Sequence, residues 1–310
     1  MSVDFTKGVL PEDYEPTTIE EVGSMVGKVA EQVIREVDAS NPLGVFEKRP
    51  IDNGTTVEQA VIKMAEAEAY DKEGLNALTR KDPDIAVRYF DTWNRQKYHT
   101  SVDISQIRKV LLTGKGAEDV STKVVSALST GDTYDKFTNL KGLFKYGRQD
   151  QTGKVFVKLD DVAYDNGIDY QEVLVRIKDT VKGMQFVNTT YNTAQINRST
   201  KAEDIYIIMD YGLKNRIDVE ELSGVFNLDK ADIKDKIIEV DTGTETIGGK
   251  KCYSVYVVDK NAILNYTRLY EMADQKNADG LFWNYFLHVE RMYALSQLFD
   301  GCYFNVIAEA

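Results

Sequence analysis

Three aspartates occupy positions that could serve metal-dependent chemistry. Asp210, Asp241 and Asp259 each end an apolar segment typical of a strand, in "IYIIMD", "KIIEVD" and "CYSVYVVD". Enzymes of phosphoryl transfer often place metal-binding carboxylates at such strand ends. A strand-ending aspartate also commonly caps a turn or a helix, because its side chain accepts hydrogen bonds from nearby backbone N–H groups. We favour the capping role and keep a soluble metal-dependent α+β enzyme as the alternative.

Other residues that could do chemistry give weaker signals. His99 and His288 are the only histidines, and neither has a Cys or His at ligand spacing, so hydrogen-bonded structural roles are expected. "TGKGAED" at 113–119 lacks the spacing and the Ser/Thr of a Walker phosphate loop. "WNRQKYH" at 93–99 could stack on nucleotides, although a solvated basic strand end is the simpler interpretation. The sequence therefore predicts no catalytic, cofactor-binding or metal-binding residue and no cofactor.

Composition narrows the class of protein. The 310 residues are 43% hydrophobic and 28% charged, which is typical of a globular chain with a substantial core. A net charge of −12 argues against a protein whose main task is to bind nucleic acid, and it suits solubility at high concentration. Cys252 and Cys302 form no CxxC motif, so buried free thiols are expected. Neither a signal peptide nor an apolar run long enough to cross a membrane is expected.

The elements that would position these residues begin with helical and extended segments. Periodic apolar residues predict a helix over 17–40 that ends at Asn41-Pro42. "GTTVEQAVIKMAEAEAY" fits a helix or a strand, whereas "IAVRYFDTW" alternates as a strand does. Two extended arms over 47–100 would form a projecting hairpin, which needs something to lie on. Helical periodicity returns over 101–146, with a break or bend expected at "STGD" (129–132).

The second half of the chain alternates strands and helices. Helices are expected over 169–184, 217–226 and 259–273, around the three strands that end in aspartate. The closing stretch "GLFWNYFLHVERMYALSQLFDGCYF" (280–304) holds eight aromatic residues in twenty-five and alternates as strands do. Both faces of its first half are apolar or aromatic. Those rings are either buried within one chain or shared with other copies of the protein.

Four segments in a fixed order carry a family resemblance. "NPLGVFEKRPIDNGTTVEQAV", "WNRQKYHTSV", "LDKADI" and "GLFWNYFLHV" are similar to segments of the major capsid (head) proteins of phi 29-like small podoviruses. The resemblance runs from about Asn41 to Phe304. It implies the Hong Kong 97-type capsid fold, of α+β class, and it favours a strand for "TVEQAVIKM".

The resemblance also implies a division into domains. Residues 1–46 would form an N-terminal arm with a helix, and 47–100 an extended E-loop hairpin that lies across a neighbouring subunit. A P-domain with a long spine helix would comprise 101–154 and 276–310. Residues 155–275 would form the A-domain, around the five- and six-fold centres of a shell.

The implied function is structural. Pentamers and hexamers of the chain would assemble into an icosahedral or prolate phage head around double-stranded DNA, contacted non-specifically. Scaffolding and portal proteins would be partners, and no membrane would be bound. The chain would be located in the virion capsid, which would be assembled in the host cytoplasm. The assembly residues expected are Arg49, Arg88, Trp93, Arg95, Tyr98, Gly248 and Gly249.

Two further expectations and one alternative complete the prediction. The sequence as given ends with "CYFNVIAEA", whereas the family's type member continues into an immunoglobulin-like domain, so decoration by that domain is not expected. No lysine–asparagine signature for crosslinking between subunits is readable. Besides the enzyme, the alternative is an interaction module that forms one defined oligomer without a shell.

Overall fold

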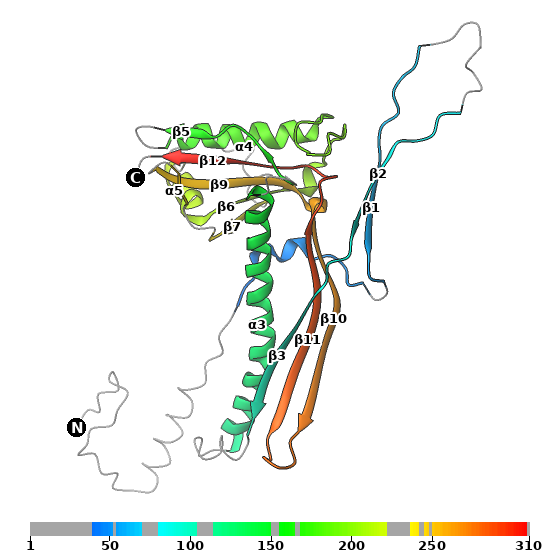
Figure 1. Cartoon of the computed structure of the whole chain (residues 1–310). Helices are drawn as coiled ribbons and strands as arrows, with labels where there is room; N and C mark the ends of the chain where they lie inside the picture. Colours follow the sequence, from blue (N-terminus) through cyan, green and yellow to red (C-terminus); the bar gives the residue numbers. More distant parts are fainter. Residues whose placement is uncertain are drawn as a thin grey trace, which may run out of the picture. The chain divides into compact units, whose positions relative to one another are not determined.

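The computed structural model describes residues 39–51, 54–69, 80–103, 114–149, 155–164, 168–221, 236–241, 245–247 and 250–308. The chain divides into two compact units (Figure 1). Among the described residues, one unit contains Lys97–Thr133 and Glu271–His288, and the other contains Ser40–Gln96, Tyr134–Tyr270 and the chain from Val289 onward.

A mixed seven-stranded sheet is the centre of the larger unit. Its strands run in the order β4-β12-β9-β6-β7, with β5 beside β12 and β8 beside β9. They are β4 (Val157–Lys158), β5 (Val162–Tyr164), β6 (Ile205–Asp210), β7 (Ile237–Val240), β8 (Glu245–Ile247), β9 (Lys250–Asp259) and β12 (Gly301–Ala308). The central strand β9 is antiparallel to both β6 and β12, whereas β6 and β7 are parallel. The three strands predicted to end in aspartate are confirmed.

The sheet has a core on each face because successive strand residues point to opposite sides. Ile207, Val257 and Cys302 are register partners across three strands and belong to one buried cluster. Their neighbours Ile208 and Tyr256 belong to the second cluster. Cys302 and Cys252 are buried and free, as predicted. Burial raises the pKa of the Cys302 thiol far above its ordinary range, so it remains protonated.

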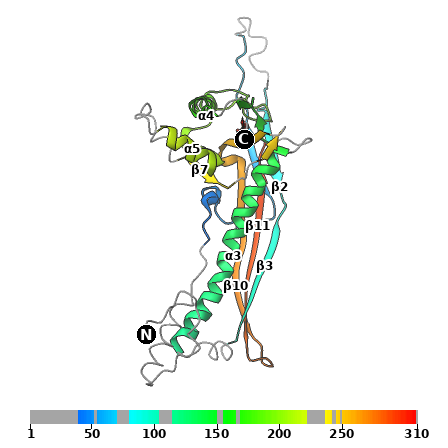
Figure 2. The same ribbon diagram turned by 90° about the vertical axis from the view of Figure 1, so that its left-hand side faces the viewer.

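Helices α4 (Tyr170–Gln185) and α5 (Tyr211–Glu221) contribute to the first cluster (Figures 1 and 2). The Asp169 side chain caps α4 by accepting hydrogen bonds from two backbone N–H groups, which confirms the helix predicted over 169–184. The helix predicted over 217–226 begins earlier, directly after β6. Asp210 Oδ1 accepts a hydrogen bond from Gly212 N at 2.9 Å there and starts the first turn of α5.

A short 3₁₀ helix and part of a long helix cover the second face of the sheet. The 3₁₀ helix η2 (Pro42–Phe46) buries Leu43 and Phe46. Asn41 Oδ1 accepts a hydrogen bond from Leu43 N at 3.1 Å, so Asn41-Pro42 starts this element. Leu140 and Phe144 of helix α3 (Gly114–Gln149) join the same cluster. The helix predicted over 17–40 lies outside the described residues, except for its last two positions, which are not helical.

Helix α3 is continuous, so the break predicted at 129–132 is wrong. Ser129 and Thr133 donate hydroxyl hydrogen bonds to carbonyls of the preceding turn at 2.7 and 2.9 Å, and such bonds keep polar residues within a helix. At Gly131 an added Cβ would lie 3.6 Å from the Tyr98 ring, so the small residue provides room for that ring. Polar residues that resemble a break are therefore compatible with the helix.

A second sheet has the order β10-β11-β3, formed by β3 (Asn94–Val102), β10 (Ile263–Lys276) and β11 (Trp283–Leu295). The strands predicted in the closing stretch are confirmed, with Leu287 and Val289 of β11 buried. The helix predicted over 259–273 is wrong: a short 3₁₀ helix η4 (Lys260–Ala262) leads into β10. Pairing with β11 overrides the helical spacing of its apolar residues. No helix in the described part of the chain is long and apolar enough to cross a bilayer.

Candidate assembly interface

The candidate interface is an antiparallel hairpin formed by β1 (Val57–Ile62) and β2 (Ile85–Phe90). Its pairing runs from Val57 opposite Phe90 to Ile62 opposite Ile85. The strand over Val57–Ile62 confirms the extended alternative for "TVEQAV". β-branched and aromatic residues at alternating positions favour such strands. The outer end of the predicted loop, residues 70–79, lies outside the described residues.

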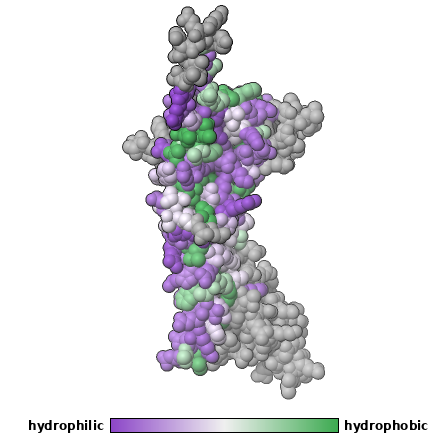
Figure 3. Space-filling model, turned by 90° about the vertical axis from the view of Figure 1, so that its right-hand side faces the viewer, coloured by the Kyte–Doolittle hydropathy of each residue, from purple (hydrophilic) through white to green (hydrophobic). Residues whose placement is uncertain are grey.

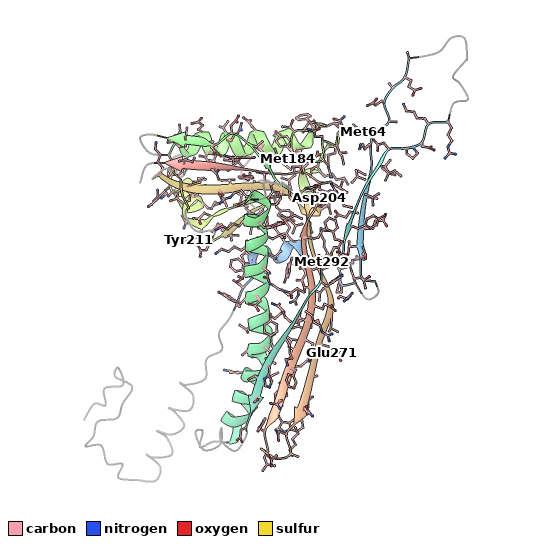
Figure 4. All side chains as sticks on the ribbon, in the orientation of Figure 1. Met64, Met184, Asp204, Tyr211, Glu271 and Met292 are labelled. Carbon is pink, nitrogen blue, oxygen red and sulfur yellow. The ribbon has the colours of Figure 1, made fainter. Side chains whose placement is uncertain are left out.

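The hairpin exposes large apolar side chains at its outer end and, at Tyr89, beside its base. Ile62 is 69% exposed, its register partner Ile85 48%, and Tyr89 66%. Met64, which follows β1, is 54% exposed (Figure 4). Hydrophobic residues gather on the face of the molecule that carries the hairpin (Figure 3). An isolated two-stranded hairpin is marginally stable, and exposed apolar groups of this kind mark surfaces that bind other proteins.

The segment before the hairpin is anchored to β10 by backbone hydrogen bonds. Lys48 N donates to Asn265 O at 2.9 Å, and Ile51 N donates to Thr267 O at 3.0 Å. The Lys48 ammonium also donates to Lys260 O at 2.9 Å. Burial, and secondarily the charge of Lys260, lowers the pKa of Lys48. The base of the hairpin is therefore fixed by several contacts within this unit.

An arginine stacked on a tryptophan holds the other side of the base. The Arg268 guanidinium carbon lies 4.7 Å from the centroid of the Trp93 ring. Arg268 also donates two hydrogen bonds to the Glu290 carboxylate, at 2.6 and 3.1 Å. These hydrogen bonds, more than the charge of Arg268 alone, lower the pKa of Glu290. Trp93 Nε1 donates to Thr55 O at 2.6 Å, which ties the two ends of the hairpin together.

Side chains along the strands add two contacts to the rest of the unit. Gln59 Nε2 donates to Asn261 O at 3.3 Å, and Arg88 Nη2 donates to Gln297 Oε1 at 3.1 Å. Farther out, Lys63 pairs with Asp84 at 2.7 Å across the hairpin. Exposed ion pairs of this kind contribute little to stability. The contacts that hold the hairpin are thus concentrated at its base, and its outer part depends on its own pairing.

The predicted assembly residues lie on different elements of the structure. Arg88 is exposed on β2, and Trp93 is half-buried at the base. Arg49 is exposed in the anchoring segment between Lys48 and Ile51. Gly248 and Gly249 lie outside the described residues.

The last two predicted assembly residues lie outside the hairpin. Arg95 is exposed and Tyr98 half-buried, both on β3 of the other sheet. The Tyr98 ring faces Gly131 of α3, which gives it a packing role within its own unit. The sequence analysis did not select Ile62, Met64 or Arg268, although the apolar residues on both faces of β1 and β2 were a usable signal for the first two.

The three strand-ending aspartates do not converge. Asp259 ends β9, where its register partner is Ile205, the first residue of β6, so Asp259 and Asp210 lie at opposite ends of the sheet. Asp241, largely exposed, lies 3.7 Å from the Lys141 ammonium. Among the described residues, no group of three or more His, Cys, Asp or Glu side chains could hold a metal ion.

Asp259 instead belongs to a buried ion-pair network around Arg198. The Arg198 guanidinium lies 2.9 Å from Asp259 Oδ2 and 3.5 Å from Asp300 Oδ2. Thr200 Oγ1 donates to Asp300 at 2.6 Å, and Asn261 N donates to Asp259 Oδ1 at 2.8 Å. Burial raises the pKa of Asp259, and the hydrogen bond from Asn261 and the charge of Arg198 oppose that rise. The aspartate therefore has the capping role that the sequence favoured, and it also forms an ion pair that the sequence did not predict.

The fold is similar to that of chains in solved phage capsid structures. The capsid structure of Staphylococcus phage Andhra has a chain that aligns with a TM-score of 0.70 at 14% identity, over 88% of this chain and 86% of that one. The capsid of Ralstonia phage GP4 aligns with a TM-score of 0.63 at 9% identity, over 97% and 96% of the two chains. At these identities the likeness shows the fold alone, and it confirms the predicted α+β capsid fold.

Sequence comparison gives the family. A family model described as Phi29-like phage major capsid protein matches residues 6–305, so the chain belongs to that family. It is 24% identical over 290 residues to the major capsid protein of Bacillus phage GA-1 and 23% identical over 319 residues to that of Streptococcus phage Cp-1. It spans 60% of the GA-1 protein and 86% of the Cp-1 protein. The family is structural, and the alternative of a metal-dependent enzyme is wrong.

Proposed function

We propose that the chain is the shell-forming subunit of a phage head, with copies arranged as pentamers and hexamers around double-stranded DNA. Membership of the capsid family and the likeness to capsid structures support this proposal. The observation that carries it is the hairpin, whose base is bonded to its own unit while Ile62, Ile85 and Tyr89 remain exposed. A neighbouring subunit would cover these side chains.

The domain assignment follows from the same proposal. Residues 47–100 would contain the E-loop, 155–275 the A-domain, and 101–154 with 276–310 the P-domain, whose spine would be α3. Arg49 and Arg95 are exposed and available for contacts between subunits, and Arg88, also exposed, is hydrogen-bonded to Gln297. Each contact would be weak, and closure of a shell stabilises the assembly because each subunit makes several contacts at once.

The charge of the chain fits controlled assembly. A net charge of −12 keeps free subunits apart, and it prevents strong adhesion to the packaged DNA. A scaffolding protein would overcome this repulsion during assembly in the host cytoplasm, and a portal protein would occupy one vertex. The DNA would be contacted non-specifically on the inner face.

Particle mass tests the proposal directly. The purified chain, alone and together with a scaffold candidate encoded in the same genome, would be measured by light scattering and imaged by negative-stain electron microscopy. We expect shells, tubes, or rings of five and six. A chain that remains monomeric in both preparations would refute the proposal, and a single small oligomer of another symmetry would favour a non-shell interaction module.

A further inference from the structure

Both histidines of the chain contact one phenylalanine in the smaller unit. The ring of Phe286 on β11 is stacked with that of His99 on β3, with centroids 4.6 Å apart and planes at 12°. His288, two residues along β11, lies with its ring centroid 6.2 Å from that of Phe286. The Lys97 ammonium lies 5.4 Å from the Phe286 centroid. Lys97, His99, Phe286 and His288 are called the histidine patch below.

The β3 side of this patch faces outward. Along β3, Lys97, His99 and Ser101 are exposed, whereas the intervening Tyr98 and Thr100 are half-buried. This alternation places the first three side chains on one face of the strand. The patch thus lies on the surface of the unit and not in its core.

Neighbouring polar groups hold the patch in a fixed geometry. Asn284 Oδ1 accepts a hydrogen bond from Ser101 Oγ at 2.6 Å and lies 3.2 Å from His99 Nε2. Stacking on Phe286 further restricts the His99 ring. A surface whose side chains are already ordered loses less conformational entropy when a partner binds.

The chemistry of the patch favours an anionic partner. Lys97 offers an ammonium and His288 an imidazole, both of which can bind carboxylates or phosphates, whereas His99 Nε2 already lies 3.2 Å from Asn284 Oδ1. The chain itself has 50 acidic and 38 basic residues, so a second copy presents many carboxylates. The Lys97 ammonium on such an acidic chain is complementary to a carboxylate of another copy.

Nucleic acid is the weaker candidate. Proteins that bind single strands use free aromatic faces on which bases stack. In this patch the Phe286 ring is already contacted by His99, His288 and Lys97 of the same chain. We propose that the histidine patch is a docking surface for a carboxylate-bearing segment of a second copy of the chain, an inference that rests on the proposed shell function.

Crosslinking within assembled particles tests this assignment. Particles would be formed from an equal mixture of ¹⁴N- and ¹⁵N-labelled chains and treated with a carbodiimide, which joins a lysine to a carboxylate in direct contact. We expect Lys97 to be joined to an aspartate or glutamate in mixed-isotope peptide pairs, which arise only between copies. Lys97 pairs of single isotope composition only, with no mixed pairs, or protection of Lys97 by copurifying nucleic acid that nuclease removes, would overturn the assignment.

Charge-reversed variants give a second readout. Lys97→Glu is expected to raise the chain concentration required for assembly at least tenfold, whereas Lys182→Glu, at an exposed lysine of α4, should leave it within twofold. Both variants change the net charge equally, and both should keep the thermal unfolding midpoint of the unassembled wild-type chain. Equal assembly of the two variants would refute the docking surface while leaving the shell function intact. Failure of the wild-type chain to assemble would refute the shell function and the docking surface together.

Discussion

The β1–β2 hairpin and the seven-stranded sheet use similar residues in opposite ways. In the sheet, Ile207, Val257 and Phe304 are at most 1% exposed, between helices and neighbouring strands. In the hairpin, Ile62 and Tyr89 have the same strand-forming character, yet about two thirds of each is exposed. Both regions belong to the same unit, so the difference does not reflect two separately folding domains.

The comparison indicates that the sheet and the hairpin have different roles within one chain. Buried apolar surface in the sheet contributes to folding, at roughly 25 cal/mol for each Å² removed from water. The exposed apolar surface of the hairpin contributes no such free energy until another molecule covers it. We infer that the sheet stabilises the subunit and that the hairpin stabilises the assembly.

The largest effect on folding is expected from Phe304→Ala. Phe304 is fully buried in the first core cluster, and removing its ring would leave a cavity between the sheet and α4. The expected loss is about 3–5 kcal/mol in the free energy of unfolding, measured by chemical denaturation of the unassembled chain. A loss below about 1 kcal/mol would contradict the contrast between the sheet and the hairpin.

A somewhat smaller loss is expected from Arg198→Ala. The substitution would leave the buried carboxylates of Asp259 and Asp300 without their guanidinium partner, which is expected to destabilise the fold by about 3 kcal/mol. Lys201→Ala is the matched control, because Lys201 pairs with Glu203 on the surface and should change stability by less than about 0.5 kcal/mol. Equal effects in the two variants would show that the network is not a structural element.

The ion pair at the hairpin base should give a modest effect that depends on pH. The pKa of Glu290 is lower in the folded chain than in the unfolded chain, where it is about 4.3. The ionised carboxylate therefore stabilises the fold above the unfolded pKa, and this stabilisation is lost as the pH falls through the folded pKa. We expect Glu290→Gln to lower the free energy of unfolding at pH 7 by about 1 kcal/mol. Well below pH 4, the variant and the wild-type chain should have the same free energy of unfolding. Denaturation curves at several pH values would check this, with Glu203→Gln as an exposed control. A difference that persists at low pH would mean that the carboxylate charge is not the cause.

The smallest effect on folding is expected from Tyr89→Ser on the hairpin. Because 66% of the side chain is already exposed, the free energy of unfolding should change by less than about 0.5 kcal/mol. The same substitution should weaken assembly, because it removes a large apolar contact from the proposed interface. A variant whose subunit is destabilised but which assembles normally would show that Tyr89 serves folding and not assembly.

Most of the fold was predictable, and the exceptions have physical causes. The continuous apolar run Ile205–Asp210 and the alternating residues of Trp283–Leu295 predict strands from the sequence alone. The segment after Asp259 has helical spacing, but pairing with a strand distant in sequence makes it β10, and local periodicity carries no information on such pairing. The segment "STGD" (129–132) likewise resembles a break, although Ser129 and the following Thr133 donate hydrogen bonds to carbonyls of the helix.

The candidate interface was predicted only in part. The strand patterns predicted the hairpin, and the family resemblance implied its role in assembly and the charged and aromatic residues expected there, among them Arg88 and Trp93. It did not separate residues that anchor the hairpin from residues left exposed, because exposure depends on which neighbour covers each face. Arg268 lies far along the chain from Trp93, and the sequence alone gave no signal of their contact.

One measurement tests the central claim, that the hairpin serves assembly and not folding. The triple variant Ile62→Ser, Ile85→Ser, Tyr89→Ser would be compared with the wild-type chain for particle mass by light scattering and for unfolding by denaturant. The account predicts an unfolding free energy within about 1 kcal/mol of the wild-type value, together with the loss of large particles. Particles of wild-type mass, or a subunit destabilised by several kcal/mol, would contradict it.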